Sequence, residues 1–219
     1  MPDFLTAGPE EAKAALLLAH GAGAGMESPF MVQMAVLLAE RGVRTLRFEF
    51  AYMAARRDGG KRRPPPRADL LTGEYRAAVA AARALVPKAR LGIGGKSMGG
   101  RVASYVADEL FSAGDVAALV CISYPFHPPN KPAQLRTAHL ERLACPALIV
   151  QGERDPFGGK DEIASYKLSN HILVHWADDG DHDLGPRGAS GFTRKGNLAA
   201  AADAIAAFLL TPSRQPARC

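Results

Sequence analysis

Short apolar runs alternate along the chain with longer segments in which apolar residues recur every three or four positions. The apolar runs predict six strands, at residues 15–20, 43–50, 90–95, 116–124, 146–152 and 171–176. The segments between them predict four helices, at residues 28–42, 72–86, 98–111 and 197–210. Several strands are apolar throughout, which is typical of strands covered on both faces. We therefore predict an α/β fold of three layers, with a doubly wound, mostly parallel sheet.

The length of 219 residues suits one domain, and 47% hydrophobic with 22% charged residues is a globular composition. We expect a single domain over 1–219, with a flexible tail at 211–219. Two irregular segments, 53–70 and 125–141, follow strands. They should therefore lie over the edge where parallel strands end and ligands bind.

The formal net charge is +5, and much of the excess lies between Arg56 and Arg67. No aromatic residue is interleaved there to stack on bases, so the segment indicates a solvated loop and disfavours a nucleic-acid partner. One hypothesis is that Arg62 and Arg63 steer an anionic substrate into the cleft.

The three cysteines, Cys121, Cys145 and Cys219, form no C-x-x-C pair. This pattern favours a reducing compartment, so we predict a cytoplasmic protein. No apolar run reaches the length of a membrane span, and no membrane partner is expected. No histidine pair has the spacing of metal ligands, so we expect neither a metal nor another cofactor.

Residues 91–100, LGIGGKSMGG, fit parts of two motifs. A phosphate-binding loop would need a glycine five residues before Gly95, and Arg90 occupies that position. The other motif is G-x-S-x-G, from Gly95 to Gly99, between an apolar strand and an amphipathic helix. This is the pattern of a nucleophile elbow, in which a strained turn exposes the serine. We therefore predict that Ser97 is a nucleophile.

A nucleophilic serine needs a base, and the base needs a carboxylate that orients it. In elbow proteins these residues follow in the order serine, acid, histidine. Asp155 comes just after the strand 146–152, and His182 lies in the loop past the next strand. The carboxylates around His182 are better explained as turn-forming residues. The predicted triad is Ser97, Asp155 and His182.

The negative charge of a tetrahedral intermediate needs two backbone N–H donors. For this elbow they are the N–H of Met98 and one from the HGAGAG loop, where Ala22 is the first candidate and Gly23 the second. The loop does not match a dinucleotide-binding fingerprint, because Met26 stands where glycine or alanine is required.

Further residues follow strand ends and could touch substrate. The candidates are Gly23, Tyr52, Tyr124 and His127. For His127, packing of its own loop is an equal alternative. His20 ends a strand just before the HGAGAG loop, so we assign it to holding that loop.

The motifs LLLAHGAGAG, GGKSMGG, VQGERDPFG and GDHDL resemble those of α/β-hydrolases, and the similarity covers nearly the whole chain. More narrowly, the chain is similar to small cap-less bacterial hydrolase-like proteins of the dienelactone hydrolase type. Residues 124–140 also resemble a segment in the hydrolase-like domain of an animal chromatin-complex subunit. The resemblance implies a minimal α/β-hydrolase fold, without a lid domain and without the first antiparallel strands of larger members. It implies the same triad and oxyanion donors.

These observations predict a serine hydrolase that cleaves an ester, thioester or related acyl bond of a small molecule. By reaction class it would be a carboxylic ester hydrolase. The alternative is a non-catalytic binding or scaffold protein that retains the fold. In that case the basic segment 56–67 and the loop 127–132 would be partner surfaces. A protein partner and the oligomeric state are left open by the sequence.

Overall fold

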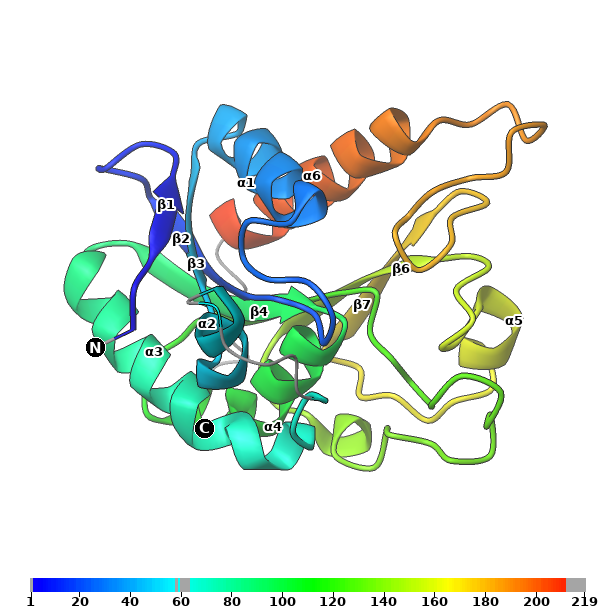
Figure 1. The fold of residues 1–219 in the computed structure, drawn as a ribbon, viewed down its shortest axis with the longest axis horizontal. Coiled ribbons are helices and arrows are strands. Elements are labelled where there is room, and N and C mark those ends of the chain that lie inside the picture. Colours follow the sequence, from blue (N-terminus) through cyan, green and yellow to red (C-terminus); the bar gives the residue numbers. More distant parts are fainter. Residues whose placement is uncertain (1, 58, 60–63, 212–219) are drawn as a thin grey trace.

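The computed structural model describes residues 2–57, 59 and 64–211 and contains a seven-stranded sheet (Figure 1). The strand order is β1-β3-β2-β4-β5-β6-β7, and every pairing except β1 with β3 is parallel. The strands are β1 (Leu5–Ala7), β2 (Ala14–Ala19), β3 (Val43–Phe48), β4 (Arg90–Lys96), β5 (Ala118–Ile122), β6 (Ala147–Gly152) and β7 (Ile172–Ala177). All residues of β2, β5 and β6 are buried, as the apolar runs predict.

Helices cover both faces of the sheet, so the predicted three-layer fold is confirmed (Figure 1). One buried cluster joins the sheet to α3 (Thr72–Leu85) and α4 (Met98–Ser112). The other joins it to α1 (Pro29–Glu40) and α6 (Arg194–Leu210). Within the described residues, no separate lid domain stands over the carboxyl ends of the strands.

Three sequence expectations need correction. The strand β1 pairs antiparallel with β3, so the expectation that the chain lacks any early antiparallel strand is wrong. The segment 53–70 is not wholly irregular, since it holds most of α2 (Ala51–Arg57) and the 3₁₀ turn η1 (Ala68–Leu71). The segment 125–141 ends in a second 3₁₀ turn, η2 (Leu140–Arg142), and the short helix α5 (Lys160–Ile163) was not predicted.

A tyrosine side chain joins α3 to the strand that precedes Ser97. The Tyr75 hydroxyl is fully buried and accepts a hydrogen bond from the N–H of Gly94 at 2.8 Å. It also lies 2.7 Å from the carbonyl oxygen of Gly94 and 3.4 Å from that of Leu17 on β2. Burial raises the pKa of this phenol, so it stays neutral. The contact fixes the layer of helices against β4.

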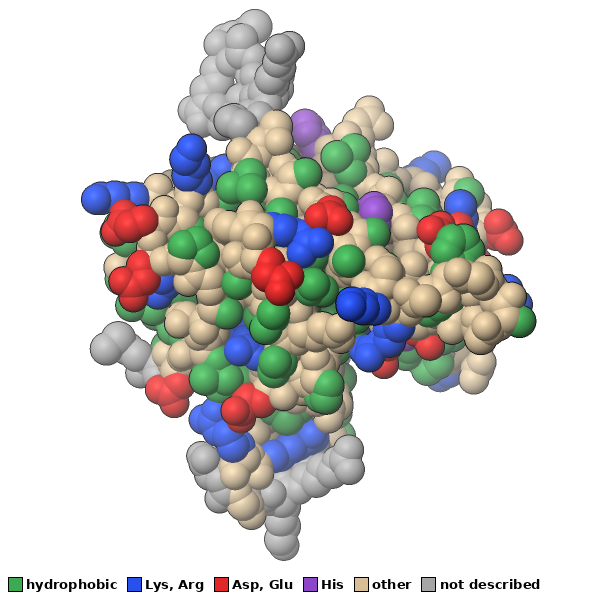
Figure 2. Space-filling model, turned by 90° about the horizontal axis from the view of Figure 1, so that it is seen from above, with side chains coloured by type: hydrophobic (Ala, Val, Ile, Leu, Met, Phe, Trp, Pro, Cys, Tyr) green, Lys and Arg blue, Asp and Glu red, His purple; other side chains and the backbone are tan. Residues whose placement is uncertain are grey.

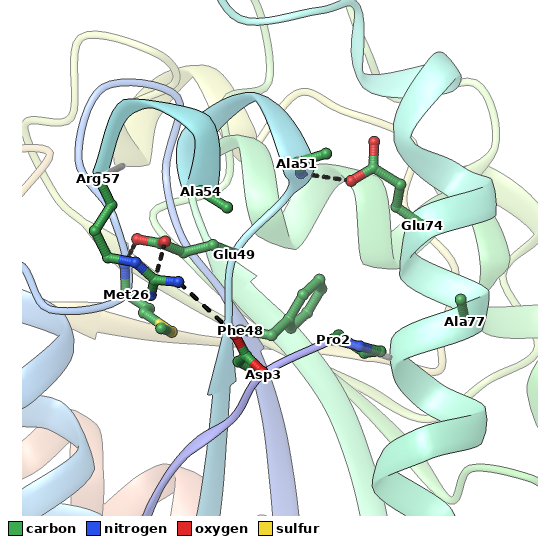
Figure 3. Close-up of a pocket in the computed structure, with 10 residues that line it drawn as sticks. All are labelled: Pro2, Asp3, Met26, Phe48, Glu49, Ala51, Ala54, Arg57, Glu74 and Ala77. Carbon is green, nitrogen blue, oxygen red and sulfur yellow. Dashed lines mark hydrogen bonds and ion pairs between the residues drawn. The ribbon is translucent and has the colours of Figure 1, made fainter. Parts of the chain in front are cut away.

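A polar network holds the start of α2 and the loop that follows β2 (Figure 3). Glu49 accepts a hydrogen bond from the N–H of Met26 at 3.1 Å, and its other oxygen lies 3.4 Å from Arg57. Glu74 of α3 accepts from the N–H of Ala51 at 2.7 Å. These groups also line a cavity of about 290 Å³ between α2, α3 and the start of the chain. We therefore assign this cavity a structural role.

The face that carries α1 and α6 is of mixed polarity (Figure 2). Lysine and arginine side chains are interspersed there with acidic and hydrophobic ones rather than gathered by sign. Of the helices in the described part of the chain, none has the length and apolar character to cross a bilayer. Arg62, Arg63 and the predicted tail beyond Thr211 lie outside the described residues.

Candidate active site

Ser97 stands at the sharp turn between β4 and α4, as the elbow motif predicts. Its backbone has φ 51° and ψ −114°, a conformation that side-chain-bearing residues rarely adopt. A Cβ atom on Gly95 would lie 2.5 Å from the carbonyl oxygen of Ala19, and one on Gly99 would lie equally close to it. The motif therefore needs glycine at both positions because the turn packs directly against the end of β2.

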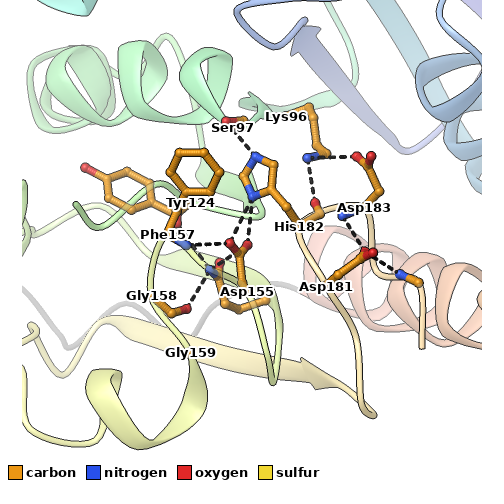
Figure 4. Close-up of polar contacts among 12 residues, drawn as sticks. Lys96, Ser97, Tyr124, Asp155, Phe157, Gly158, Gly159, Asp181, His182 and Asp183 are labelled. Carbon is orange, nitrogen blue, oxygen red and sulfur yellow. Dashed lines mark hydrogen bonds and ion pairs between the residues drawn. The ribbon is translucent and has the colours of Figure 1, made fainter. Parts of the chain in front are cut away.

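Ser97, His182 and Asp155 form a continuous chain of hydrogen bonds (Figure 4). The Ser97 Oγ lies 3.0 Å from Nε2 of His182, and Nδ1 of that ring lies 2.8 Å from Oδ2 of Asp155. Because a carboxylate only accepts, Nδ1 carries the proton and Nε2 is free to accept from the serine hydroxyl. This tautomer is the one that a general base requires.

The Asp155 carboxylate is buried and fixed from several directions. Its side chain is inaccessible to solvent. Oδ1 accepts a hydrogen bond from the N–H of Phe157 at 2.9 Å, and Oδ2 accepts one from Nε2 of Gln151 at 3.0 Å. The Phe157 ring lies against the imidazole of His182, with centroids 4.4 Å apart. These contacts set the position of the base before any ligand binds.

Lys96, directly before Ser97, supports the loop that carries His182. Its Nζ donates to the backbone oxygen of His182 at 2.7 Å and lies 3.3 Å from the Asp183 carboxylate. The ammonium also sits 5.2 Å from the ring centre of Phe30. Burial lowers the pKa of Lys96, while Asp183 opposes that effect.

The two predicted oxyanion donors lie beside Ser97. Met98 is the first residue of α4, so its N–H has no partner within the helix. The Ala22 loop is held by Tyr52, whose hydroxyl donates to the Ala22 carbonyl at 3.1 Å. His20 is buried and accepts at Nε2 from the N–H of Phe50, while its Nδ1 lies 2.6 Å from the Gly21 oxygen. His20 therefore holds this loop.

Ser97 lies where two lobes of an open cleft meet, and Ala22 and Phe157 line both lobes with it. The first lobe has a volume of about 500 Å³ and contains His182 and a mainly apolar wall that includes Phe30. The second lobe, of about 600 Å³, contains Met98 and the side chains of α4. A substrate can therefore extend in two directions from the nucleophile.

The four candidate substrate contacts divide into two groups. Gly23 lines the first lobe, and Tyr52 is half-buried beside it, where it supports Ala22. Tyr124 is wholly buried and donates to the Arg136 carbonyl at 2.9 Å. His127 is 3% exposed and lies 3.1 Å from Glu162. For Tyr124 and His127, the structure supports packing rather than contact with substrate.

A second serine–histidine pair lies inside the α4 layer. Ser104 Oγ is 2.8 Å from Nε2 of His139 and donates to the Arg101 carbonyl. Burial, with the nearby Arg101 charge, lowers the pKa of His139 to about 4. Among the described side chains no carboxylate hydrogen-bonds to this imidazole, and Ser104 is itself buried. This pair lacks the exposed hydroxyl and the oriented base of the Ser97 site.

Sequence reasoning missed several residues of the site. Gln151 had a local signal, because it is the one polar residue in the apolar run ALIVQ, four positions before Asp155. Lys96 lies within the elbow motif, but its contact with the His182 loop joins residues 86 positions apart. Arg101 and Arg136, which line the second lobe, carried no motif at all.

The sheet order, the strained serine and the hydrogen-bonded histidine and aspartate define the architecture of an α/β-hydrolase. Residues 12–210 match the family model of an alpha/beta hydrolase domain, and the chain belongs to this family.

Solved structures agree on the fold. The chain is similar to a dienelactone hydrolase from Anabaena variabilis, with 21% identity, 94% of this chain and 96% of the other covered, and a TM-score of 0.70. A serine hydrolase homologue from Coxiella burnetii is 17% identical, with 94% of this chain and 89% of the other covered and a TM-score of 0.67. A serine hydrolase without a lid from Xanthomonas campestris is 17% identical, with 98% of this chain and 97% of the other covered and a TM-score of 0.63. The resemblance of residues 124–140 to a chromatin-complex subunit stays a prediction.

Proposed function

We propose that this protein is a serine hydrolase that cleaves an ester, thioester or related acyl bond of a small molecule. The observation that carries the proposal is the hydrogen-bonded chain from Ser97 through His182 to Asp155, with the serine at a strained elbow. A buried carboxylate that fixes the imidazole tautomer is the arrangement that activates a serine hydroxyl.

In the proposed reaction, Ser97 Oγ attacks the acyl carbon while its proton passes to Nε2 of His182. The carbonyl oxygen becomes an oxyanion and binds the N–H groups of Met98 and Ala22. The imidazolium then protonates the leaving alcohol or thiol, and an acyl-enzyme remains on Ser97. Water attacks the acyl-enzyme, loses a proton to His182, and releases the acid and the free serine.

Labelling with a fluorophosphonate, read by intact mass, tests this proposal. We expect one adduct on the wild type and none on Ser97→Ala. Ser104→Ala is the matched control, because Ser104 also lies next to a histidine but is buried. That control should be labelled like the wild type.

The alternative of a non-catalytic binding protein gives a different result. A folded wild type without an adduct, together with no turnover of an ester panel, would contradict the proposed hydrolase. The panel should include thioesters and oxyesters of the same acyl chain, because the proposal covers both kinds of leaving atom. The cytoplasmic location rests on the cysteine pattern alone and stays a prediction.

A further inference from the structure

The second lobe of the cleft carries an excess of positive charge beside the nucleophile. Its lining includes Arg67, Arg101 and Arg136 but one carboxylate, Asp69. Asp69 is already paired with Arg67, through contacts of 3.1 and 2.9 Å. No carboxylate of the described residues lies within ion-pair distance of Arg101 or Arg136.

The two arginines reach the lobe from separate elements. Arg101 lies one helical turn after Ser97 on α4, so its side chain is on the same side of the helix as the nucleophile. Its Nε donates to the Tyr105 hydroxyl at 2.9 Å, and the guanidinium lies 5.5 Å from the centre of that ring. Arg136 comes from the loop before η2, which Tyr124 holds through the Arg136 carbonyl. The Arg101 guanidinium is therefore anchored by Tyr105, whereas for Arg136 it is the backbone that is held.

Neither arginine forms an ion pair with a described residue, although the Arg101 charge contributes to lowering the pKa of Asp69. Both side chains are half-buried. Burial lowers the pKa of Arg136, and the Arg101 charge lowers it further. His139, next to Arg101, is neutral at pH 7 because its pKa is lowered to about 4, so it adds no further positive charge. Two cations held together in a partly desolvated lobe favour an anion that binds both, and guanidinium forks match oxyanions well.

The position of His182 decides which part of a substrate enters this lobe. His182 lines the first lobe and not the second. Because the imidazolium must protonate the leaving group, the leaving group belongs in the first lobe. The acyl chain then extends past Met98 into the lobe of the two arginines.

We propose that Arg101 and Arg136 form a subsite for an oxyanion at the far end of the acyl chain, so that the preferred substrates are esters or thioesters of anionic acyl groups. The inference rests on the proposed hydrolase function. Hydrolysis of such a half-ester consumes one water and yields a dianionic acid, a neutral alcohol or thiol, and one proton. The hypothesis that Arg62 and Arg63 steer an anionic substrate stays a prediction, because both residues lie outside the described part of the chain.

Two matched esters test the subsite in the full-length protein: the 4-nitrophenyl monoester of adipic acid and 4-nitrophenyl hexanoate. We expect wild-type kcat/KM to favour the adipate monoester at least about tenfold, as a charge-assisted contact would give. In Arg136→Gln and in Arg101→Gln/Arg136→Gln the ratio should fall towards one. The single variant guards against misfolding, because the Arg136 guanidinium makes no hydrogen bond with a described residue.

Two control variants locate the effect. Arg76→Gln changes an arginine outside the lobe that is paired with Glu109, and Arg194→Gln changes an arginine of the first lobe. Both should keep the wild-type ratio. A ratio that falls in Arg194→Gln but not in Arg136→Gln would overturn the proposed direction of the acyl chain.

Inhibition and binding separate the possible failures. Adipate and pentyl phosphate are used as competitive inhibitors of hexanoate ester hydrolysis, and the stronger inhibitor shows whether a carboxylate or a phosphate is the preferred oxyanion. Inhibition by either compound should be weaker in the double variant than in the wild type. If Ser97 is labelled but the ester ratio is near one, the subsite is wrong and the hydrolase stands. If Ser97 is not labelled, calorimetric titration with adipate still decides the subsite, and equal binding by wild type and double variant would refute it.

Discussion

The Lys96 ammonium donates to the backbone oxygen of His182 at 2.7 Å, so the residue before Ser97 holds the loop that carries His182. The serine and histidine of the site are thus joined twice, once through their side chains and once through this lysine. In the proposed reaction, the second connection would keep the imidazole in place when its own hydrogen bond to the serine is broken.

Replacement of this lysine should therefore slow the chemical step. For Lys96→Met we expect kcat to fall about tenfold with KM changed less than twofold, since a hydrogen bond from a charged group is lost. Steady-state kinetics and the rate of fluorophosphonate labelling both measure the effect. Lys160→Met, which removes a half-exposed lysine paired with Glu153, should leave both unchanged. A rise in KM alone would contradict the positioning role.

The hydrogen bond from Gln151 to Asp155 gives a second prediction. Gln151→Leu leaves one oxygen of a buried carboxylate without its side-chain donor. We expect the rate of labelling at Ser97 to fall about tenfold or more, because such bonds contribute about 1.5–3 kcal/mol. Gln134→Leu, an exposed position in the same part of the fold, is the control. Equal rates in the two variants would show that Gln151 does not support the acid.

Substitution at the elbow should cost stability as well as activity. In Gly99→Ala the new Cβ would lie 2.5 Å from the Ala19 oxygen and 2.6 Å from the His20 oxygen. We expect the free energy of unfolding to fall by about 2–3 kcal/mol, the range typical of overpacking. Gly73→Ala on α3 meets no atom within 4 Å and should stabilise by about 0.5–1 kcal/mol. Urea denaturation distinguishes the two outcomes.

His139 predicts a loss of stability at mildly acidic pH. Its folded pKa of about 4 lies below the ordinary histidine value of 6.5, so between these pH values the unfolded chain binds a proton that the folded protein does not. Stability is therefore complete above pH 6.5 and declines as the pH falls towards 4. Allowing for partial exposure, we expect a loss of about 1 kcal/mol at pH 5.

Comparison of variants isolates this contribution. His139→Gln should show a shallower decline in unfolding free energy between pH 6.5 and 4.5 than the wild type. His171→Gln changes an exposed histidine and should retain the wild-type slope. Buried His20 adds a decline of the same sign in both variants, because burial lowers its pKa too. Parallel curves for His139→Gln and the wild type would contradict the prediction.

The sequence predicts most of the architecture because each central element carries its own hydrophobic period. All six predicted strands and four predicted helices are present, and Ser97, Asp155 and His182 meet as their chain order suggested. The strand β1 was missed because its three residues are too few to show an alternation of apolar and polar positions. They form a strand only by pairing with β3. The arginine pair was missed because Arg101 and Arg136 converge only through the tertiary fold.

The buried Tyr75 hydroxyl has a consequence for how the protein opens. It bonds to the backbone of Gly94, so α3 cannot leave the sheet without uncovering polar groups of β4. Helix and strand should therefore unfold as one cooperative unit rather than in succession. The amide protons around the elbow would then exchange with solvent only through an opening that detaches α3, which makes the nucleophile among the last parts of the molecule to lose its order.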